Sequence, residues 1–171
     1  MMIFKQLYDS TLKYRKNAWN YPDVDGQLVN IVPNPSAGLI TFHFKVKSQK
    51  HRNEGYMVRI QFYNVEFSDH PLSSTSIKII DKDTGKPLYF ERISLTDKNK
   101  KNFVRVRCGC SDFRFRFAWE DRAVNALWGG VPKSYTPVPG SKRPPVNPDH
   151  IPGMCKHVYA CAKAIQQYFS R

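Results

Sequence analysis

Two short pairs of metal-binding residue types constrain this chain more than any other feature. Cys108 and Cys110 are separated by one glycine, Cys155 and His157 by one lysine, and 44 residues lie between the pairs. Zinc in proteins is held by four cysteine or histidine ligands in a tetrahedron. A glycine between the first two ligands can adopt a positive φ, so we expect the chain to turn there. The pattern predicts one structural zinc ion bound by these four residues.

An alternative is that the cysteines are ordinary core residues, because cysteine is among the most buried residue types. A fifth residue that could bind the metal, Cys161, lies one turn beyond His157 on the apolar side of a predicted helix. We expect Cys161 to pack in the core, with displacement of one ligand of the second pair as the alternative. No disulfide is expected, since the chain lacks a secretory signal pattern and a membrane-spanning run, both of which would indicate an oxidising compartment.

The same residues argue against a catalytic zinc ion. Four protein ligands leave no coordination position for a reacting water molecule. The His-x-Glu pattern of zinc deaminases and the His-Glu-x-x-His pattern of metalloproteases are both absent from the sequence. We therefore expect a protein without enzymatic activity.

Residues 38–107 show the alternation of a half-buried antiparallel β-sheet or sandwich. Apolar residues from Ile40 to Val46 occupy every second position, and Val58, Ile60 and Phe62 repeat the pattern. Five strands are predicted, within residues 38–47, 56–67, 76–81, 87–93 and 103–108.

Residues 1–37 form a separate N-terminal region. A short helix or, as an alternative, an extended arm is predicted by the spacing of Ile3, Phe4, Leu7, Tyr8 and Leu12. The stretch that follows contains Pro22, Gly26, Pro33 and Pro35, and we expect it to be irregular.

Residues 108–171 hold the metal candidates, a proline-rich loop over residues 132–152 and a final helix. The helix is predicted over residues 157–169 because Val158, Cys161 and Ile165 form one apolar stripe. We expect this region to form one compact unit with residues 38–107.

Directly after the first pair, the segment Ser111–Phe117 alternates phenylalanine with arginine, which predicts a strand. Its three phenylalanines would pack on the final helix. The alternative role is functional, since guanidinium groups bind phosphates and carboxylates. The candidate contacts for a polyanion or an acidic partner are Arg105, Arg107, Arg114 and Arg116.

The ligand order resembles the SWIM-type zinc finger, which has a Cys-x-Cys pair, a variable spacer and a Cys-x-His pair on a β-β-α frame. The resemblance covers roughly residues 103–169 and implies the zinc ligands already named. The spacer here is longer than in many members and rich in proline. The segments RCGCSDFRFRFAW and RPPVNPDHIPGMCKHVYA are also similar in sequence to SWIM-like segments of small tailed-phage proteins.

Charge supplies the last constraint. A formal net charge of +13 and an isoelectric point near 9.7 favour polyanionic or acidic partners. From this and the resemblance we expect an α+β structural component of a phage virion, assembled in the host cytoplasm. It would contact other virion proteins in a baseplate, tail or neck and bind nucleic acid without sequence preference. A nucleic-acid-binding zinc-finger protein is the alternative.

Overall fold

The computed structural model describes residues 1–17, 24–47, 55–94, 102–130, 147 and 149–168, with only the backbone described for residues 15–17. It has an α+β fold with antiparallel sheets and a C-terminal helix, which confirms the predicted class. The helices are α1 (Phe4–Asn17), η1 (Pro35–Ala37), α2 (Ser111–Arg116), α3 (Ala118–Ala123) and α4 (Lys156–Tyr168). The strands are β1 (Gly26–Asn34), β2 (Leu39–Lys47), β3 (Gly55–Phe62), β4 (Phe67–Ser68), β5 (Ser76–Ile80), β6 (Pro87–Glu91) and β7 (Val104–Cys108).

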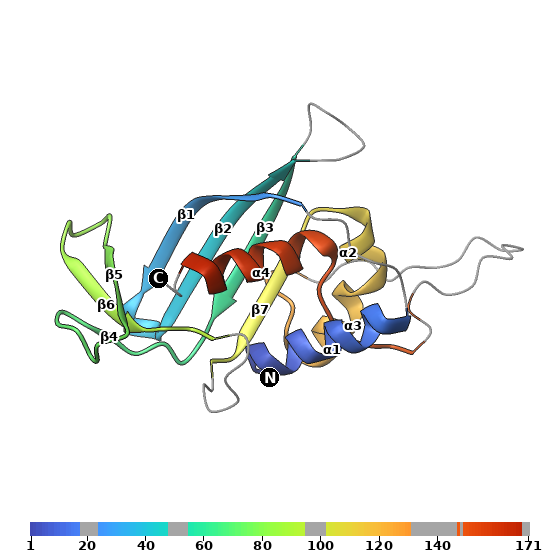
Figure 1. Ribbon diagram of the computed structural model, residues 1–171, viewed down its shortest axis with the longest axis horizontal. Coiled ribbons are helices and arrows are strands. Elements are labelled where there is room, and N and C mark those ends of the chain that lie inside the picture. The colour runs from blue at the N-terminus through green and yellow to red at the C-terminus, as the bar shows by residue number, and fades with distance from the viewer. Residues whose placement is uncertain (18–23, 48–54, 95–101, 131–146, 148, 169–171) are drawn as a thin grey trace, which may run out of the picture.

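The main sheet has four antiparallel strands in the order β1-β2-β3-β7. Its alternation is the predicted one, because Phe42, Phe44, Val58 and Ile60 are all fully buried. Helix α4 crosses this apolar face, as Figure 1 shows, and contributes Ile165 to the same core. The other face of the sheet carries the polar residues of the alternation.

The expected irregular stretch before residue 38 contains a strand. Residues Gly26–Asn34 pair with β2 along its whole length, with one irregularity near Leu28. Pro33 lacks an amide hydrogen, which argues against a central strand but is tolerated in β1 because β1 lies at the edge of the sheet. The proline therefore misled the sequence interpretation.

A second, three-stranded sheet has the order β4-β6-β5 and lies at one end of the main sheet (Figure 1). Strands β5 and β6 lie within the predicted segments 76–81 and 87–93, whereas β4 begins at the last residue of the predicted segment 56–67 and extends beyond it. Phe90 on its central strand is fully buried and belongs to the same hydrophobic core as the main sheet. The predicted β region thus divides into two sheets around one core.

The strand predicted over Ser111–Phe117 is wrong, because residues 111–116 form α2 and α3 follows at once. Cys110 caps α2 by accepting a hydrogen bond from the amide of Phe113. Phe113 and Phe117 are buried, whereas Phe115 is 44% exposed. Residues four apart share a helical face, and the same spacing was compatible with strand alternation. The ligands are consequently not on the expected β-β-α frame, since a helix replaces its second strand.

Helix α1 occupies the place where a helix or an extended arm was expected. Phe4 and Leu7 are buried in the core, and the Phe4 ring meets Phe62 edge-on with 4.7 Å between ring centroids.

Within the described parts of the chain, no helix is both long and apolar enough to cross a membrane.

Candidate metal centre

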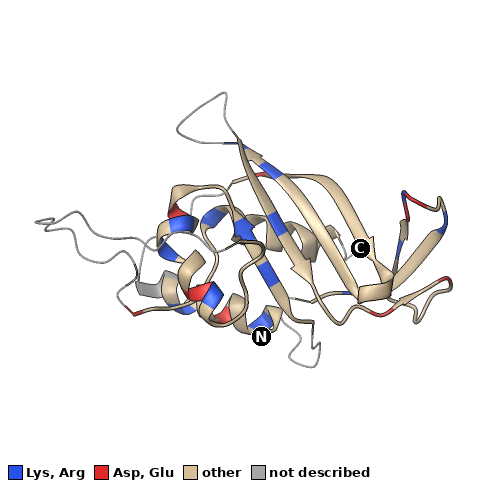
Figure 2. Ribbon diagram, turned by 180° about the vertical axis from the view of Figure 1, so that it is seen from behind, with Lys and Arg blue, Asp and Glu red and all other residues tan. Residues whose placement is uncertain are grey.

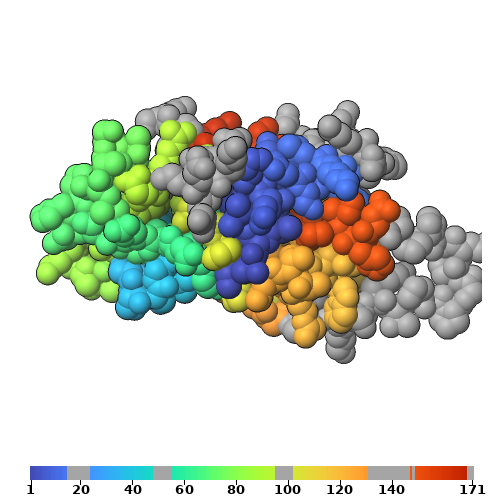
Figure 3. Space-filling model, turned by 90° about the horizontal axis from the view of Figure 1, so that it is seen from below, coloured from blue at the N-terminus to red at the C-terminus, as the bar shows by residue number. Residues whose placement is uncertain are grey.

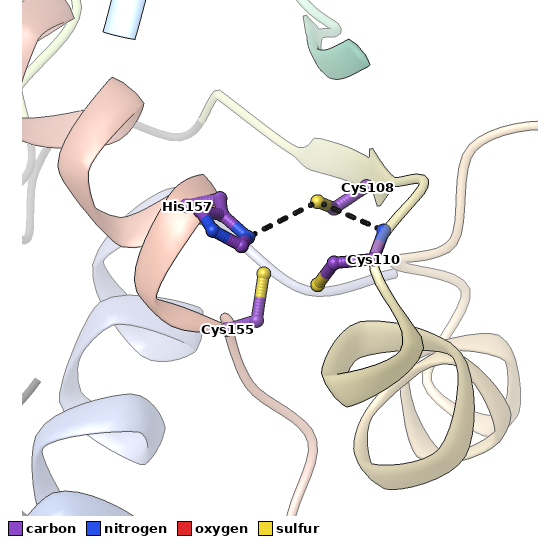
Figure 4. A group of neighbouring side chains, drawn as sticks. All are labelled: Cys108, Cys110, Cys155 and His157. Atoms are coloured by element: carbon purple, nitrogen blue, oxygen red, sulfur yellow. Dashed lines mark hydrogen bonds between the residues drawn. The ribbon is translucent and has the colours of Figure 1, made fainter. Parts of the chain in front are cut away.

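Four buried side chains converge where β7 ends and where α2 and α4 begin (Figure 4). Cys108 is the last residue of β7, and Cys110 is the N-cap of α2. Cys155 immediately precedes α4, and His157 lies in its first turn. One ligand atom from each side chain lies within 4.8 Å of the other three, so the group could hold a metal ion. The structure thus brings all four predicted ligands together.

The spacing of the atoms fits a small ion at the centre of the group. Cys108 Sγ lies 3.7 Å from His157 Nδ1. In a tetrahedron with metal–sulfur and metal–nitrogen bonds of about 2.3 and 2.0 Å, these atoms would be about 3.5 Å apart. His157 therefore presents Nδ1, not Nε2, to the three sulfurs.

Backbone amides fix the first pair. The amide of Cys110 donates to Cys108 Sγ at 3.5 Å, and the amide of Phe113 donates to Cys110 Sγ at 3.3 Å. The amide of Gly109 donates to the carbonyl oxygen of Met57 on β3 at 3.2 Å. The first two bonds orient the sulfurs and stabilise negative charge on them, and the third fixes the intervening glycine to β3.

The role expected for Gly109 is not observed. Its φ is not among the positive values, and a Cβ built on it would meet no atom within 4 Å. The turn between the two cysteines is made by the hydrogen bonds of the neighbouring residues, so it does not require a glycine.

The three thiols cannot all ionise at neutral pH in the absence of a cation. Hydrogen bonds from the side chains of Cys108 and Cys155 hold the pKa of Cys110 far below its usual range. The hydrogen bond with Cys110 raises the pKa of Cys108, and burial raises the pKa of Cys155 well above its usual range. Cys110 is therefore the thiol that ionises most readily, whereas Cys108 and Cys155 favour the neutral form. A bound cation would supply the charge needed to hold all three as thiolates.

The second pair is positioned by buried polar side chains that the sequence analysis did not single out. Thr11 Oγ1 on α1 accepts a hydrogen bond from the amide of Met154 at 3.0 Å. Asp121 Oδ1 on α3 accepts one from the amide of Gly153 at 2.8 Å. Both side chains are fully buried. The residues just before Cys155 are thus held between two helices that are distant in the sequence.

Asn147 and Ser10 extend this support. Asn147 Nδ2 donates to the carbonyl oxygens of Arg116 and Ile151, both at 2.8 Å, and Ser10 Oγ donates to that of Pro152. Figure 3 shows the segment that ends at residue 155 lying between α1 and the α2–α3 pair. A threonine, an aspartate and an asparagine give no periodic signal in a sequence, so only their burial identifies this role.

Comparison with known proteins decides no family for this chain. No family model, no curated protein and no solved structure matches it. The relation to SWIM fingers rests on the pattern of the ligands alone.

Cys161 is separate from the metal group. It is fully buried on α4 within the hydrophobic core, as predicted, and burial raises the pKa of its thiol to about 12. A Cβ on Gly26 would lie 2.7 Å from Cys161 Sγ, so β1 approaches the thiol closely. A neutral, tightly packed thiol is the state this site favours.

The four arginines proposed as polyanion contacts do not form one stripe. Arg105 and Arg107 lie on β7, whereas Arg114 and Arg116 lie on α2. Arg116 is paired with Asp112 through Nη1 and Oδ1 at 3.0 Å. We expected Arg105 and Arg107 on one strand to extend a stripe formed by Arg114 and Arg116 on the next strand, but residues 111–116 form a helix.

Proposed function

We propose that Cys108, Cys110, Cys155 and His157 bind one structural zinc ion, as in SWIM-type fingers. Three thiolates and one imidazole are a donor set that zinc takes in closed sites, and a tetrahedral site of this kind favours zinc over hard cations. With all four positions taken by protein, the ion has no place for substrate. The proposal therefore includes no enzymatic activity.

Elemental analysis of protein expressed with several metals in excess tests this site. We expect about one zinc per chain, and little iron or copper. Replacing zinc by cobalt should give the intense visible absorption of tetrahedral cobalt–thiolate coordination. Clearly sub-stoichiometric zinc after expression with excess zinc would contradict the proposal.

We further infer that the chain is a structural component of a tailed-phage virion, in a baseplate, tail or neck. The similarity of its segments to phage proteins motivates this, and an exposed aromatic pair supports a role in protein contacts. Trp119 is 49% and Phe115 is 44% exposed. Arg122 lies over the Trp119 ring, 5.5 Å from its centroid, and Arg114 lies 5.4 Å from that of Phe115. Tryptophan and arginine are enriched among residues that dominate protein interfaces.

Mass spectrometry of purified particles, together with a pull-down of tail and neck proteins at physiological salt, tests the assignment. Trp119→Ala should reduce capture of a partner, because it removes a large aromatic side chain that would become buried on binding. Tyr168→Ala is the matched control, since Tyr168 on α4 is also an exposed aromatic residue. Absence of the chain from particles would rule out the virion role.

The alternative is a nucleic-acid-binding protein whose zinc module is the reader, which the charge of +13 favours. Within its described part, α4 offers only Lys156 and Lys163 as cations. Sequence-selective DNA binding that persists at physiological salt, with no protein partner recovered, would establish this alternative.

A further inference from the structure

Three strands of the main sheet, β2, β3 and β7, carry cations, and none of its four strands carries an acidic residue. We call the outer face of this sheet, away from α4, the basic face. Its cations are Lys45, Lys47, Arg59, Arg105 and Arg107. Each lies at a position that alternates with a buried residue, so all five are on the same face.

Strand register brings the arginines together. Arg59 on β3 lies directly opposite Arg107 on β7, and Gln61 lies opposite Arg105. His43 on β2 lies on the other side of Arg59. Like charges directly opposite each other destabilise a sheet. Burial and the nearby Arg59 both lower the pKa of His43, which is consistent with a positive potential here.

Neutral groups hold these guanidinium groups in place. Arg107 Nη1 donates to the carbonyl oxygens of Trp128 at 3.0 Å and Gly130 at 2.7 Å. Arg59 lies over the Trp128 ring, 4.6 Å from its centroid. Carbonyl oxygens and rings orient a guanidinium group without cancelling its charge.

Arg105 is held in the same way. Its Nη2 donates to Asn125 Oδ1 at 3.3 Å, and its guanidinium lies 4.9 Å from the centroid of the Tyr63 ring. None of the ion pairs found among the described residues includes an arginine of the basic face. The three charges are therefore ordered before any ligand arrives, which lowers the entropic cost of binding.

No described helix covers the basic face. Figure 2 views the sheet from the side opposite to α4, and the strands with their basic residues lie at the front. Arg59, Arg105 and Arg107 are each partly exposed, and Lys45 and Lys47 are exposed.

We propose that the basic face binds the phosphate backbone of nucleic acid. Guanidinium groups match phosphate oxygens in pairs. Nucleic-acid interfaces are more polar and much more positively charged than protein–protein interfaces. The residues at the centre of this face are Thr41, His43, Arg59, Gln61, Arg105 and Arg107. An acidic protein is therefore the less suitable occupant.

This site lies on the sheet and contains no metal ligand, so it depends on neither the identity of the metal nor the virion role. The basic face would not distinguish base sequences, because phosphate contacts position a protein without specifying bases. We therefore expect binding to single-stranded and duplex DNA of unrelated sequences.

Fluorescence anisotropy with labelled 20-nucleotide DNA, single-stranded and duplex, over a salt series tests the proposal. The Arg59→Gln/Arg105→Gln/Arg107→Gln protein should bind about a hundredfold more weakly near 0.1 M salt. Its log–log salt slope should fall by about 2 to 3, since each phosphate contact contributes about 0.7 to 0.9. Unlabelled polyglutamate should compete weakly.

The matched control removes the same charge elsewhere. Lys78→Gln/Lys86→Gln/Lys163→Gln changes three exposed cations outside the main sheet and should retain most of the affinity. A second variant, Lys45→Gln/Lys47→Gln, is used if the arginine variant fails to fold, and we expect it to lower the salt slope by more than 1. Zinc content is measured on every variant, so loss of the metal site is recognised separately. Equal losses in the sheet and control variants, unchanged affinity in the sheet variants, or polyglutamate binding as tight as DNA would overturn the proposal.

Discussion

At the scale of single residues, the composition of the metal centre depends on which cysteine side chains point toward the other candidate ligands. Cys155 immediately before α4 and Cys161 near the middle of α4 are both fully buried, yet only Cys155 Sγ belongs to the group of four. Burial alone therefore does not identify a ligand. What distinguishes the two is the direction in which each side chain leaves the backbone.

Replacing these cysteines separately should give opposite results. Cys155→Ala should lose the metal and most of the folding free energy that the ion supplies, which is of order 10 kcal/mol in small zinc domains. Cys161→Ala should retain the metal and cost about 1 kcal/mol of packing. Elemental analysis and urea unfolding measure both effects. Equal metal content in the two variants would show that the fourth ligand is misassigned.

At the scale of elements, helix α1 is a support for the second ligand pair. Thr11→Val keeps the shape of the side chain but leaves the buried amide of Met154 without its hydrogen-bond partner. Such a loss costs about 1–3 kcal/mol. We expect faster transfer of the metal to a competing chelator, measured by a colour change.

Thr41→Val is the matched control for this variant. Thr41 is also buried, but it accepts its hydrogen bond from Gln61 Nε2 on the main sheet. It should lower stability without changing the rate of metal transfer. If both threonine variants release metal at the same rate, α1 does not position the second pair.

Helix α3 contributes a buried carboxyl group with a pH-dependent effect. Burial raises the pKa of Asp121 well above its usual range, and its Oδ2 has no hydrogen-bond partner in the described structure. The folded state therefore holds this proton more tightly than the unfolded state. The resulting stabilisation is complete below about pH 4 and is lost as the pH rises through the folded pKa.

Asp121→Asn should remove the loss of stability that the unchanged protein shows as the pH rises. Relative to the unchanged protein, the variant should gain free energy of unfolding as the pH rises above about 4, since the asparagine oxygen can still accept from Gly153. Urea unfolding of both proteins across this range measures the difference, and the shared metal site contributes equally to each. A difference that does not change with pH would contradict the raised pKa.

At the scale of the whole molecule, the metal centre links parts that are far apart in the sequence. It joins the end of the main sheet to α4, and α4 covers the apolar face of that sheet. Domains of this size are typically stable by about 5–15 kcal/mol, which is comparable to the contribution of a structural zinc ion.

Removal of the metal should therefore unfold α1, α4 and the main sheet together. Hydrogen exchange after addition of a chelator should show simultaneous loss of protection in these elements. Chelator already saturated with zinc is the control and should have no effect. Retained protection throughout the chain would mean that the fold does not depend on the ion.

The sequence by itself determined the elements whose pattern has a single interpretation. The alternation in β2 and β3 and the apolar stripe of α4 each correspond to one period, and the four candidate metal ligands follow from residue type and spacing. Two patterns were ambiguous in physical terms. Phe113 and Phe117 are compatible with either period, and Pro33 excludes a central strand but not an edge.

Only the tertiary structure decided the remaining features. Thr11 and Asp121 act on the residues before Cys155 across more than 30 positions of chain, and no local pattern encodes such a contact. Arg59 lies opposite Arg107 because β3 and β7 are neighbours in the sheet, although 47 residues lie between them in the sequence. Short-range periodicity is set by the backbone geometry of one element. The partners of a buried polar group or a surface charge are set by which elements pack together, and that is a property of the folded chain.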